Sequence, residues 1–240
     1  MSAVAPELSV LLPAFNEAES VPVIWSELGP VLDAISRPAE VIFVDDGSAD
    51  ATPEVVRSIR AADPRVRLVR LAANAGLSAA LDAGFQRARG RIIVTLDSDL
   101  QNDPRDIPRM LAALEGYDAV TGWRQQRDDP WLKRMSSRIG NGIRNAITGD
   151  HVHDSACTLR VIRSGCLARL PRFRGFHRFV PTLLRLAGCR VLELPVGHRA
   201  RRFGISHYGI RNRVFVAFED LLAVRWMQDR WLRYEVSEET

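Results

Sequence analysis

Short apolar runs alternate with segments of helical periodicity along the first half of the chain. Runs rich in Val, Ile and Leu predict strands at 8–12, 41–45, 66–71, 91–97 and 117–121. Amphipathic segments between them predict helices at 17–35, 51–62, 76–89 and 104–115. Regular alternation of strands and helices indicates an α/β fold with a mostly parallel sheet flanked by helices.

The second half has a less regular pattern. Residues 131–148 predict a basic helix with several small residues, 176–187 predict another helix, and 189–196 predict a strand. Residues 199–213 read as a loop with two glycines. A strongly apolar helix is expected over 214–231, so the chain should end in a helical elaboration of the α/β fold.

Polar residues follow the carboxyl ends of three predicted strands. These segments are Pro13-Ala-Phe-Asn-Glu17, Asp45-Asp46-Gly47-Ser48 and Asp97-Ser-Asp99. The carboxyl ends of parallel strands share one edge of a sheet, where α/β proteins bind ligands. Two carboxylates two residues apart can hold a hard divalent cation there. Taken alone, the pair fits two solvated loop acids better than a metal site, and only its neighbouring motifs reverse that interpretation.

Four motifs together resemble the family 2 inverting glycosyltransferases, which have the GT-A fold. They are the three segments above and Asn74-Ala-Gly76, in that family's order and usual spacing over roughly the first half of the chain. The resemblance implies a nucleotide-diphospho-sugar transferase fold. It also implies a nucleotide pocket lined by Pro13, Ala14, Glu17 and Asp46, with Asn74 in a second nucleotide-side loop. From the residues alone, Asn74 and Gly76 also fit an ordinary turn before a helix.

The same resemblance predicts a metal site for Mg²⁺ or Mn²⁺. Asp99 would hold the cation, Asp97 would help directly or through water, and Gln101 lies nearby in the sequence. An ion with oxygen ligands there would act as a Lewis acid on a departing diphosphate. Gln101 would equally fit a polar surface residue.

The second half carries two further resemblances. The segment Asp154-Ser-Ala-Cys-Thr-Leu-Arg160 is similar to one in bacterial undecaprenyl-phosphate aminoarabinose transferases and, more loosely, in dolichol-phosphate mannose synthases. Residues 199–208 resemble an Arg-x-x-Gly-x-Ser-x-Tyr stretch of the same enzymes, with His207 where a lysine is common. The resemblance implies a polyprenyl phosphate, undecaprenyl or dolichyl, as the sugar acceptor.

A lipid phosphate needs positioning and charge compensation more than a strong base, because its second pKa lies at about 6. Arginines present forked donors that suit phosphate. Asp154 is expected to orient the acceptor or an arginine, to act as a weak base, or only to cap a turn. We expect catalytic roles for Asp99, Asp154 and Arg160. The arginines that could bind phosphate, or could be solvated surface residues, are Arg124, Arg160, Arg199 and Arg202.

Charge is unevenly distributed over the 240 residues, whose net charge is +4. Residues 1–120 carry 18 acidic and 11 basic side chains, whereas residues 121–240 carry 11 acidic and 22 basic ones. The basic half should meet phosphate groups or an anionic membrane surface. Nucleic acid is the competing partner, but no nucleic-acid motif accompanies the arginines, so none is expected.

The composition also bears on location. Cys157, Cys166 and Cys189 are too few and too scattered for a disulfide framework or a zinc site, which favours reduced thiols and the cytoplasm. No signal peptide and no apolar run of ~18 residues is visible, so we expect peripheral association with the inner face of the membrane. The last helix would lie in the membrane interface, or pack on its own domain or on a second subunit of a homo-oligomer.

Three function hypotheses follow. In the leading one, residues 1–212 form a catalytic domain, with a nucleotide-sugar half (1–122) and an acceptor half (123–212), followed by an amphipathic helix and tail (213–240). It would transfer a sugar with inversion from a nucleotide diphosphate, UDP favoured over GDP, to a polyprenyl phosphate. One alternative is a saccharide acceptor in cell-envelope polysaccharide assembly, which the lack of an obvious base disfavours. Another is a non-catalytic protein that binds nucleotide sugar or anionic lipid.

Overall fold

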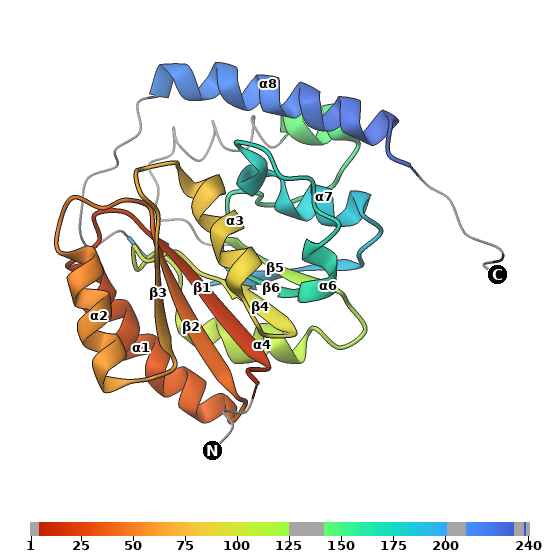
Figure 1. Cartoon of the computed structure of the whole chain (residues 1–240). Coiled ribbons are helices and arrows are strands. Elements are labelled where there is room, and N and C mark those ends of the chain that lie inside the picture. The colour runs from red at the N-terminus through yellow and green to blue at the C-terminus, as the bar shows by residue number, and fades with distance from the viewer. Residues whose placement is uncertain (1–4, 125–141, 201–209, 233–237, 239–240) are drawn as a thin grey trace.

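The computed structural model describes residues 5–124, 142–200, 210–232 and 238, with the side chains of 210–215 excepted. Its centre is a seven-stranded sheet in the spatial order β3-β2-β1-β4-β6-β5-β7 (Figure 1). The strands are β1 (Leu8–Ala14), β2 (Ala39–Asp45), β3 (Val66–Arg70), β4 (Ile92–Thr95), β5 (Ala119–Arg124), β6 (Arg160–Arg163) and β7 (Val191–Val196). Strands β3, β2, β1 and β4 are mutually parallel, β7 is parallel to β5, and β6 is antiparallel to β4 and β5.

Helices cover both faces of the sheet (Figure 1). One face carries α1 (Ser20–Ile35), α2 (Thr52–Ala62) and α4 (Ile107–Ala112), the last preceded by the 3₁₀ turn η1 (Pro104–Asp106). The other face carries α3 (Leu77–Arg87), α6 (Ser164–Leu167), α7 (Val180–Leu186) after the turn η2 (Phe176–Arg178), and α8 (Ile210–Asp229). Residues 142–148 are also helical.

Alternating side chains along each strand build two separate cores. Val41 and Phe43 of β2 pack on the face of α1 and α2, whereas Ile42 and Val44 pack on the face of α3 and α7. Successive residues of a strand point to opposite faces, so apolar residues at every position predict a sheet buried on both sides. All four of these side chains are fully buried.

The predicted α/β architecture with a mostly parallel sheet and a C-terminal helix is confirmed. Strand β6 was not predicted, because Arg-Val-Ile-Arg is short and has a charged residue at each end. Only its neighbours in space make it a strand, since Val161 pairs with Val94 of β4 and with Val120 of β5. The predicted helix over 131–148 is described only from residue 142 onward, and the rest lies outside the described residues.

Gly90 lies in the turn between α3, which ends at Arg87, and β4, which begins at Ile92. A Cβ at Gly90 would lie 2.6 Å from the backbone nitrogen of Ser9, so the residue must be glycine to let this turn approach β1.

Helix α8 lies across the side of the molecule that carries α3 and α7 (Figure 1). Two of its residues, Leu221 and Val224, are buried, and its Asp220 forms an ion pair with Arg178 at 2.9 Å. Its opposite side exposes Phe218, Leu222 and Trp226. Within the described residues, no helix is both long enough and apolar enough to cross a membrane.

Candidate active site

The two carboxylates after β4 lie in a tightly bonded turn. Asp99 is only 7% exposed, and one of its carboxylate oxygens accepts a hydrogen bond from the Gln101 N–H at 3.1 Å. The Ser98 hydroxyl donates to the carbonyl of Pro13 at 2.8 Å, which ties the turn to the end of β1. Leu100 has a φ of +65°, an uncommon conformation for a residue with a side chain. The fold thus holds this turn in a defined geometry at the carboxyl edge of the sheet.

Asp97 shows how strongly charges interact here. Burial raises the pKa of Asp97 to about 6, and the nearby negative charge of Asp99 adds to the effect. A hydrogen bond with Thr158 and the positive charges of Arg160 and Arg124 act in the opposite direction. The structure therefore brings the two predicted carboxylates together with two of the arginines predicted to bind phosphate.

The donor set fits Mg²⁺ or Mn²⁺. Two adjacent carboxylates that repel each other are stabilised by a bound cation, and both ions prefer oxygen ligands. Over the described ranges, no three His, Cys, Asp or Glu side chains gather to hold a metal. The remaining ligands would therefore be oxygens of a bound diphosphate or of water. The Gln101 backbone is hydrogen-bonded through both of its polar groups, because its N–H donates to Asp99 and its carbonyl accepts a hydrogen bond from the Arg199 N–H at 2.9 Å.

Asp46, at the end of β2, holds the second nucleotide-side loop in place. Its two carboxylate oxygens accept hydrogen bonds from the N–H groups of Ala75 and Gly76, at 2.7 and 2.8 Å. Asn74 in the same loop is exposed. Gly47 allows the close approach, because it has a φ of +71° and a Cβ there would lie 2.5 Å from the carbonyl carbon of Ala73. Besides its predicted contact with the nucleotide, Asp46 thus has a structural role that the sequence did not reveal.

The predicted residues of the first strand end lie beside Asp46. Pro13 and Ala14 are the last two residues of β1, and the Ala14 carbonyl accepts a hydrogen bond from the Asp46 N–H at 2.8 Å. Glu17 lies in the following turn, where its carboxylate accepts a hydrogen bond from the Ser20 hydroxyl at 2.5 Å. The carboxyl ends of β1, β2 and β4 therefore contribute their predicted residues to one edge.

Asp154 and Arg124 form a buried, two-pronged ion pair. The Arg124 Nε and Nη2 atoms donate to the two carboxylate oxygens of Asp154 at 2.6 and 3.0 Å. Both side chains are largely shielded from solvent. This geometry fixes the plane of the guanidinium group. Of the roles predicted for Asp154, the structure provides the orientation of an arginine.

Among the predicted arginines that the structure describes, Arg160 is the most deeply buried, at 1% exposure. Its Nη2 donates to the carbonyls of Ser155 and His177, both at 3.2 Å. Burial lowers the pKa of Arg160, while the thiol of Cys157 and the carboxylates of Asp97 and Asp154 act to raise it. Strand β6 therefore directs a cation toward the acids of the site.

Two further arginines, Arg199 and Arg202, were predicted to bind phosphate. Arg199 lies between two carboxylates, Glu27 of α1 at 2.7 Å and Asp103 at 2.6 Å, which already compensate its charge. These contacts connect α1 to the segment after β4. Arg202 and His207 lie outside the described residues.

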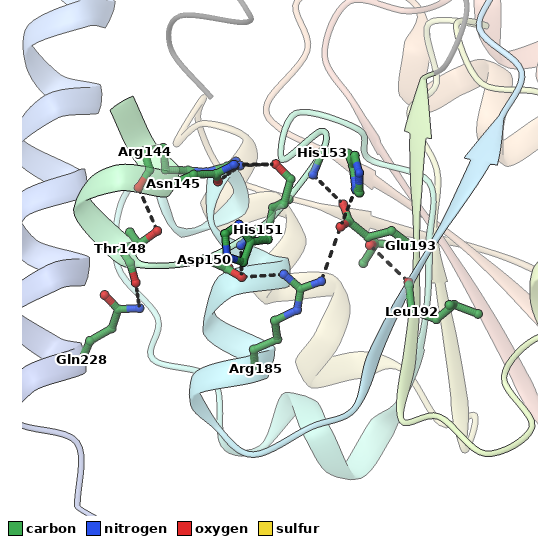
Figure 2. Close-up of polar contacts among 12 residues, drawn as sticks. Arg144, Asn145, Thr148, Asp150, His151, His153, Arg185, Leu192, Glu193 and Gln228 are labelled. Carbon is green, nitrogen blue, oxygen red and sulfur yellow. Dashed lines mark hydrogen bonds and ion pairs between the residues drawn. The ribbon is translucent and has the colours of Figure 1, made fainter. Parts of the chain in front are cut away.

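A network of charged residues beside this site was missed in the sequence (Figure 2). Arg185 bridges Asp150 at 2.5 Å and Glu193 at 3.4 Å, and Glu193 contacts the Nδ1 atom of His153 at 3.1 Å. Buried Arg144 donates to the carbonyl of Val152 at 2.8 Å. The network fixes residues 150–153 and so positions the Asp154 that follows. Its partners are separated by up to 40 residues, and no local motif marks them.

Comparison with known proteins agrees with this geometry. The model of Glycosyl transferase family 2 matches residues 9–170. The dodecaprenyl-phosphate galacturonate synthase of Rhizobium johnstonii is 37% identical over 235 residues, which are 95% of this chain and 68% of that protein. The undecaprenyl-phosphate 4-deoxy-4-formamido-L-arabinose transferase of Aeromonas hydrophila is 36% identical over 88% of this chain and 66% of its own length. The chain thus spans about two thirds of both relatives.

Solved structures match the fold at lower sequence identity. The glucosyl-3-phosphoglycerate synthase of Mycobacterium tuberculosis, in complex with Mn²⁺ and UDP-glucose, superimposes with a TM-score of 0.69 and 21% identity. The match covers 93% of this chain and 79% of that one. The same enzyme with Mn²⁺, UDP and glucosyl-3-phosphoglycerate gives a TM-score of 0.68. The match of the family model to residues 9–170, the identity to the two relatives and the shared architecture show that this chain belongs to glycosyl transferase family 2 and is a glycosyltransferase with the GT-A fold.

Proposed function

We propose that the protein transfers a sugar with inversion from a nucleotide diphosphate, UDP in preference to GDP, to a polyprenyl phosphate. The observation that carries this proposal is the juxtaposition of Asp97 and Asp99 with the oriented cations Arg124 and Arg160. The two aspartates suit a metal-bound diphosphate, and the two arginines suit an anionic acceptor. The proposal is supported by two relatives named dodecaprenyl-phosphate galacturonate synthase and undecaprenyl-phosphate 4-deoxy-4-formamido-L-arabinose transferase, and by a structural neighbour that holds UDP-glucose and Mn²⁺.

On the donor side, the ends of β1 and β2 would form the nucleotide pocket. Asp46 holds the loop at Ala75 and Gly76 through two hydrogen bonds, so the pocket is shaped before the nucleotide binds. Asp97 and Asp99 would hold Mg²⁺ or Mn²⁺, which when bound supplies a Lewis acid for the charge that develops on the departing diphosphate.

On the acceptor side, the arginines supply what a phosphate nucleophile requires. A phosphate monoester is largely ionised at neutral pH, because its second pKa is about 6. Arg124, oriented by Asp154, and Arg160, held by two carbonyls, would orient the phosphate oxygen toward the sugar and offset its charge. A single displacement from the face opposite the diphosphate inverts the anomeric carbon, so an α-linked donor would give a β-linked product.

We place the enzyme peripherally on the inner face of the cytoplasmic membrane. The outer side of α8 exposes Phe218, Leu222 and Trp226, with Trp226 60% exposed and the Arg230 guanidinium 5.3 Å from its ring. Apolar residues flanked by arginines suit the interface of an anionic bilayer. Cosedimentation with vesicles containing phosphatidylglycerol, compared with vesicles of phosphatidylcholine alone, tests this placement.

The function is tested with a panel of UDP- and GDP-sugars, undecaprenyl phosphate and Mn²⁺ or Mg²⁺ in detergent. We expect the wild-type protein to form one glycolipid, and the Asp99→Ala variant or a chelator to abolish it. Consumption of donor without a lipid product would favour a saccharide acceptor. Binding of nucleotide sugar without any turnover in any combination would favour a non-catalytic protein.

A further inference from the structure

A groove of about 510 Å³ opens beside the start of α3, outside the residues assigned above to the metal and the acceptor phosphate. One wall is the loop before α3 and the first turns of that helix, and the other is the segment that leads into η2. The volume is within the range of ligand pockets. Its lining residues are Asn74, Ala75, Gly76, Ser78, Ala79, Asp82, Arg172, Phe173, Arg174 and Phe176.

The walls of the groove combine apolar surface with positive charge. Ala75 and Ala79 line one wall and Phe173 lines the other, whereas Phe176 is only 1% exposed. Arg172 forms an ion pair with Asp82, so its charge is compensated. Arg174 is exposed and, within the described residues, makes no ion pair. Such a lining suits a branched hydrocarbon chain that carries an anionic group.

Contacts at the inner end of the groove lead directly to the active site. The Ser78 hydroxyl lies 2.7 Å from Nδ1 of His177 and accepts a hydrogen bond from the Gly175 N–H at 2.9 Å. The carbonyl of His177 accepts a hydrogen bond from Arg160, whose charge acts on Asp97. On the opposite wall, the Gly76 N–H donates to Asp46. These contacts link one wall of the groove to Arg160 and the loop before α3 to Asp46.

We propose that this groove binds the isoprene units next to the phosphate of the acceptor lipid, with the phosphate directed toward Arg160. This inference rests on the function proposed above. Half-buried Phe173, whose ring packs edge-on against buried Phe176, provides the surface against which the methyl-branched chain packs, and Ala79 leaves the space that it occupies. Arg174, at the rim, attracts the anionic lipid to the groove.

The direct test is to fill the groove. Ala79 is only half-buried, so Ala79→Trp places an indole in the groove without disturbing a core position. We expect the KM for undecaprenyl phosphate to rise at least tenfold, while the Kd for UDP in the presence of Mn²⁺ stays within twofold. Ala61→Trp, at an exposed position of α2, is the matched control and should change neither value.

A short acceptor locates the bound part of the lipid. With geranyl phosphate, which has two isoprene units, Ala79→Trp should raise the KM by the same factor as with undecaprenyl phosphate. Arg174→Glu, a surface change, should weaken both acceptors several-fold. An unchanged KM in Ala79→Trp, or a loss of UDP affinity equal to the loss of acceptor affinity, would overturn the proposal.

Binding of radiolabelled undecaprenyl phosphate, measured without donor, separates this inference from the proposed function. If wild-type protein binds the lipid, Ala79→Trp does not, and no donor yields a glycolipid, then the groove is correct and the proposed reaction is wrong. If wild-type protein and Ala79→Trp bind the lipid equally, the groove is not its site, whatever the enzyme synthesises.

Discussion

The two halves of the molecule hold their functional side chains by different means. In the nucleotide-side half, backbone N–H groups hold the acids, with Ala75 and Gly76 donating to Asp46 and Gln101 donating to Asp99. In the half predicted to bind the acceptor, ion pairs between side chains add to backbone contacts such as those of Arg160 with two carbonyls. Asp154 pairs with Arg124 there, and Arg185 joins Asp150 to Glu193 (Figure 2).

This difference explains why the residues of one half could be recognised from short sequence motifs, whereas the ion pairs of the other half could not. Asp46 and the Gly76 N–H that it binds are 30 positions apart, but each lies in a short recognisable motif, Asp45-Asp46-Gly47-Ser48 and Asn74-Ala-Gly76. An ion pair requires only two charged residues that the fold brings together. Arg124 and Asp154 are likewise 30 positions apart, and no motif marks Arg124. Because the two halves use different kinds of contact, substitutions in each should change stability and activity by different amounts.

The largest effect on stability should come from the acceptor half. Asp154→Ala leaves Arg124 buried without this partner, which should lower the free energy of unfolding by about 3–5 kcal/mol. Chemical denaturation measures the loss. The double variant Arg124→Met with Asp154→Ala should recover part of it, because no buried charge remains. A double variant as unstable as the sum of both single changes would show that the pair does not act as a unit.

The largest effect on catalysis should come from the nucleotide-side half. Asp99→Asn keeps the shape of the side chain but removes its charge, and should lower kcat about 100-fold or more. Initial rates with saturating Mn²⁺ give the comparison. Glu115→Gln, an exposed acid between α4 and β5, is the matched control and should keep full activity. Equal activity of Asp99→Asn and wild type would remove Asp99 from the site.

An intermediate effect on stability is expected where backbone N–H groups bind a carboxylate. Asp46→Asn exchanges one charged acceptor for an amide donor that faces the N–H of Ala75 or Gly76, and should cost about 1.5–3 kcal/mol of stability. The hydrogen-exchange rates of those two amides should rise as the stability falls. A stability equal to wild type would mean that the loop between β3 and α3 is held by other contacts.

Metal binding should depend on pH through Asp97. Its pKa of about 6 in the metal-free protein lies above the ordinary value of 3.8, so protons compete with Mn²⁺ for this carboxylate below pH 6. Mn²⁺ affinity, measured by calorimetry, should fall up to tenfold per pH unit there. Without metal, the free energy of unfolding should decrease as the pH rises from about 4 to about 6, because the folded state retains a proton that the unfolded state releases. Asp97→Asn should abolish both dependences.

The smallest effect on stability is expected on the outer side of α8. Trp226→Gln changes a largely exposed side chain and should alter the free energy of unfolding by no more than about 0.5 kcal/mol, while binding to anionic vesicles falls several-fold. Leu221→Ala, one turn earlier on the buried side of the helix, should instead cost about 2–5 kcal/mol. Vesicle binding unchanged by Trp226→Gln would mean that this side of α8 does not contact lipid.

The first half of the chain was predicted closely because its signals are local. Uniformly apolar runs specified strands buried on both faces, and the acids after β2 and β4 lie at the edge where a parallel sheet must place them. Strand β6 escaped prediction because Arg-Val-Ile-Arg becomes a strand only between β4 and β5. A four-residue segment has too little periodicity of its own to be recognised.

The sequence by itself determined the α/β class, the edge that carries the site and the acids at that edge, because each is marked by short patterns of neighbouring residues in the chain. Only the tertiary structure decided which arginines reach those acids. Arg160 and Arg124 approach Asp97, whereas Arg199, equally plausible in the sequence, is engaged by Glu27 and Asp103. The reason is physical: the partner of a long charged side chain is set by how the strands and helices pack, and that packing is a property of the whole fold.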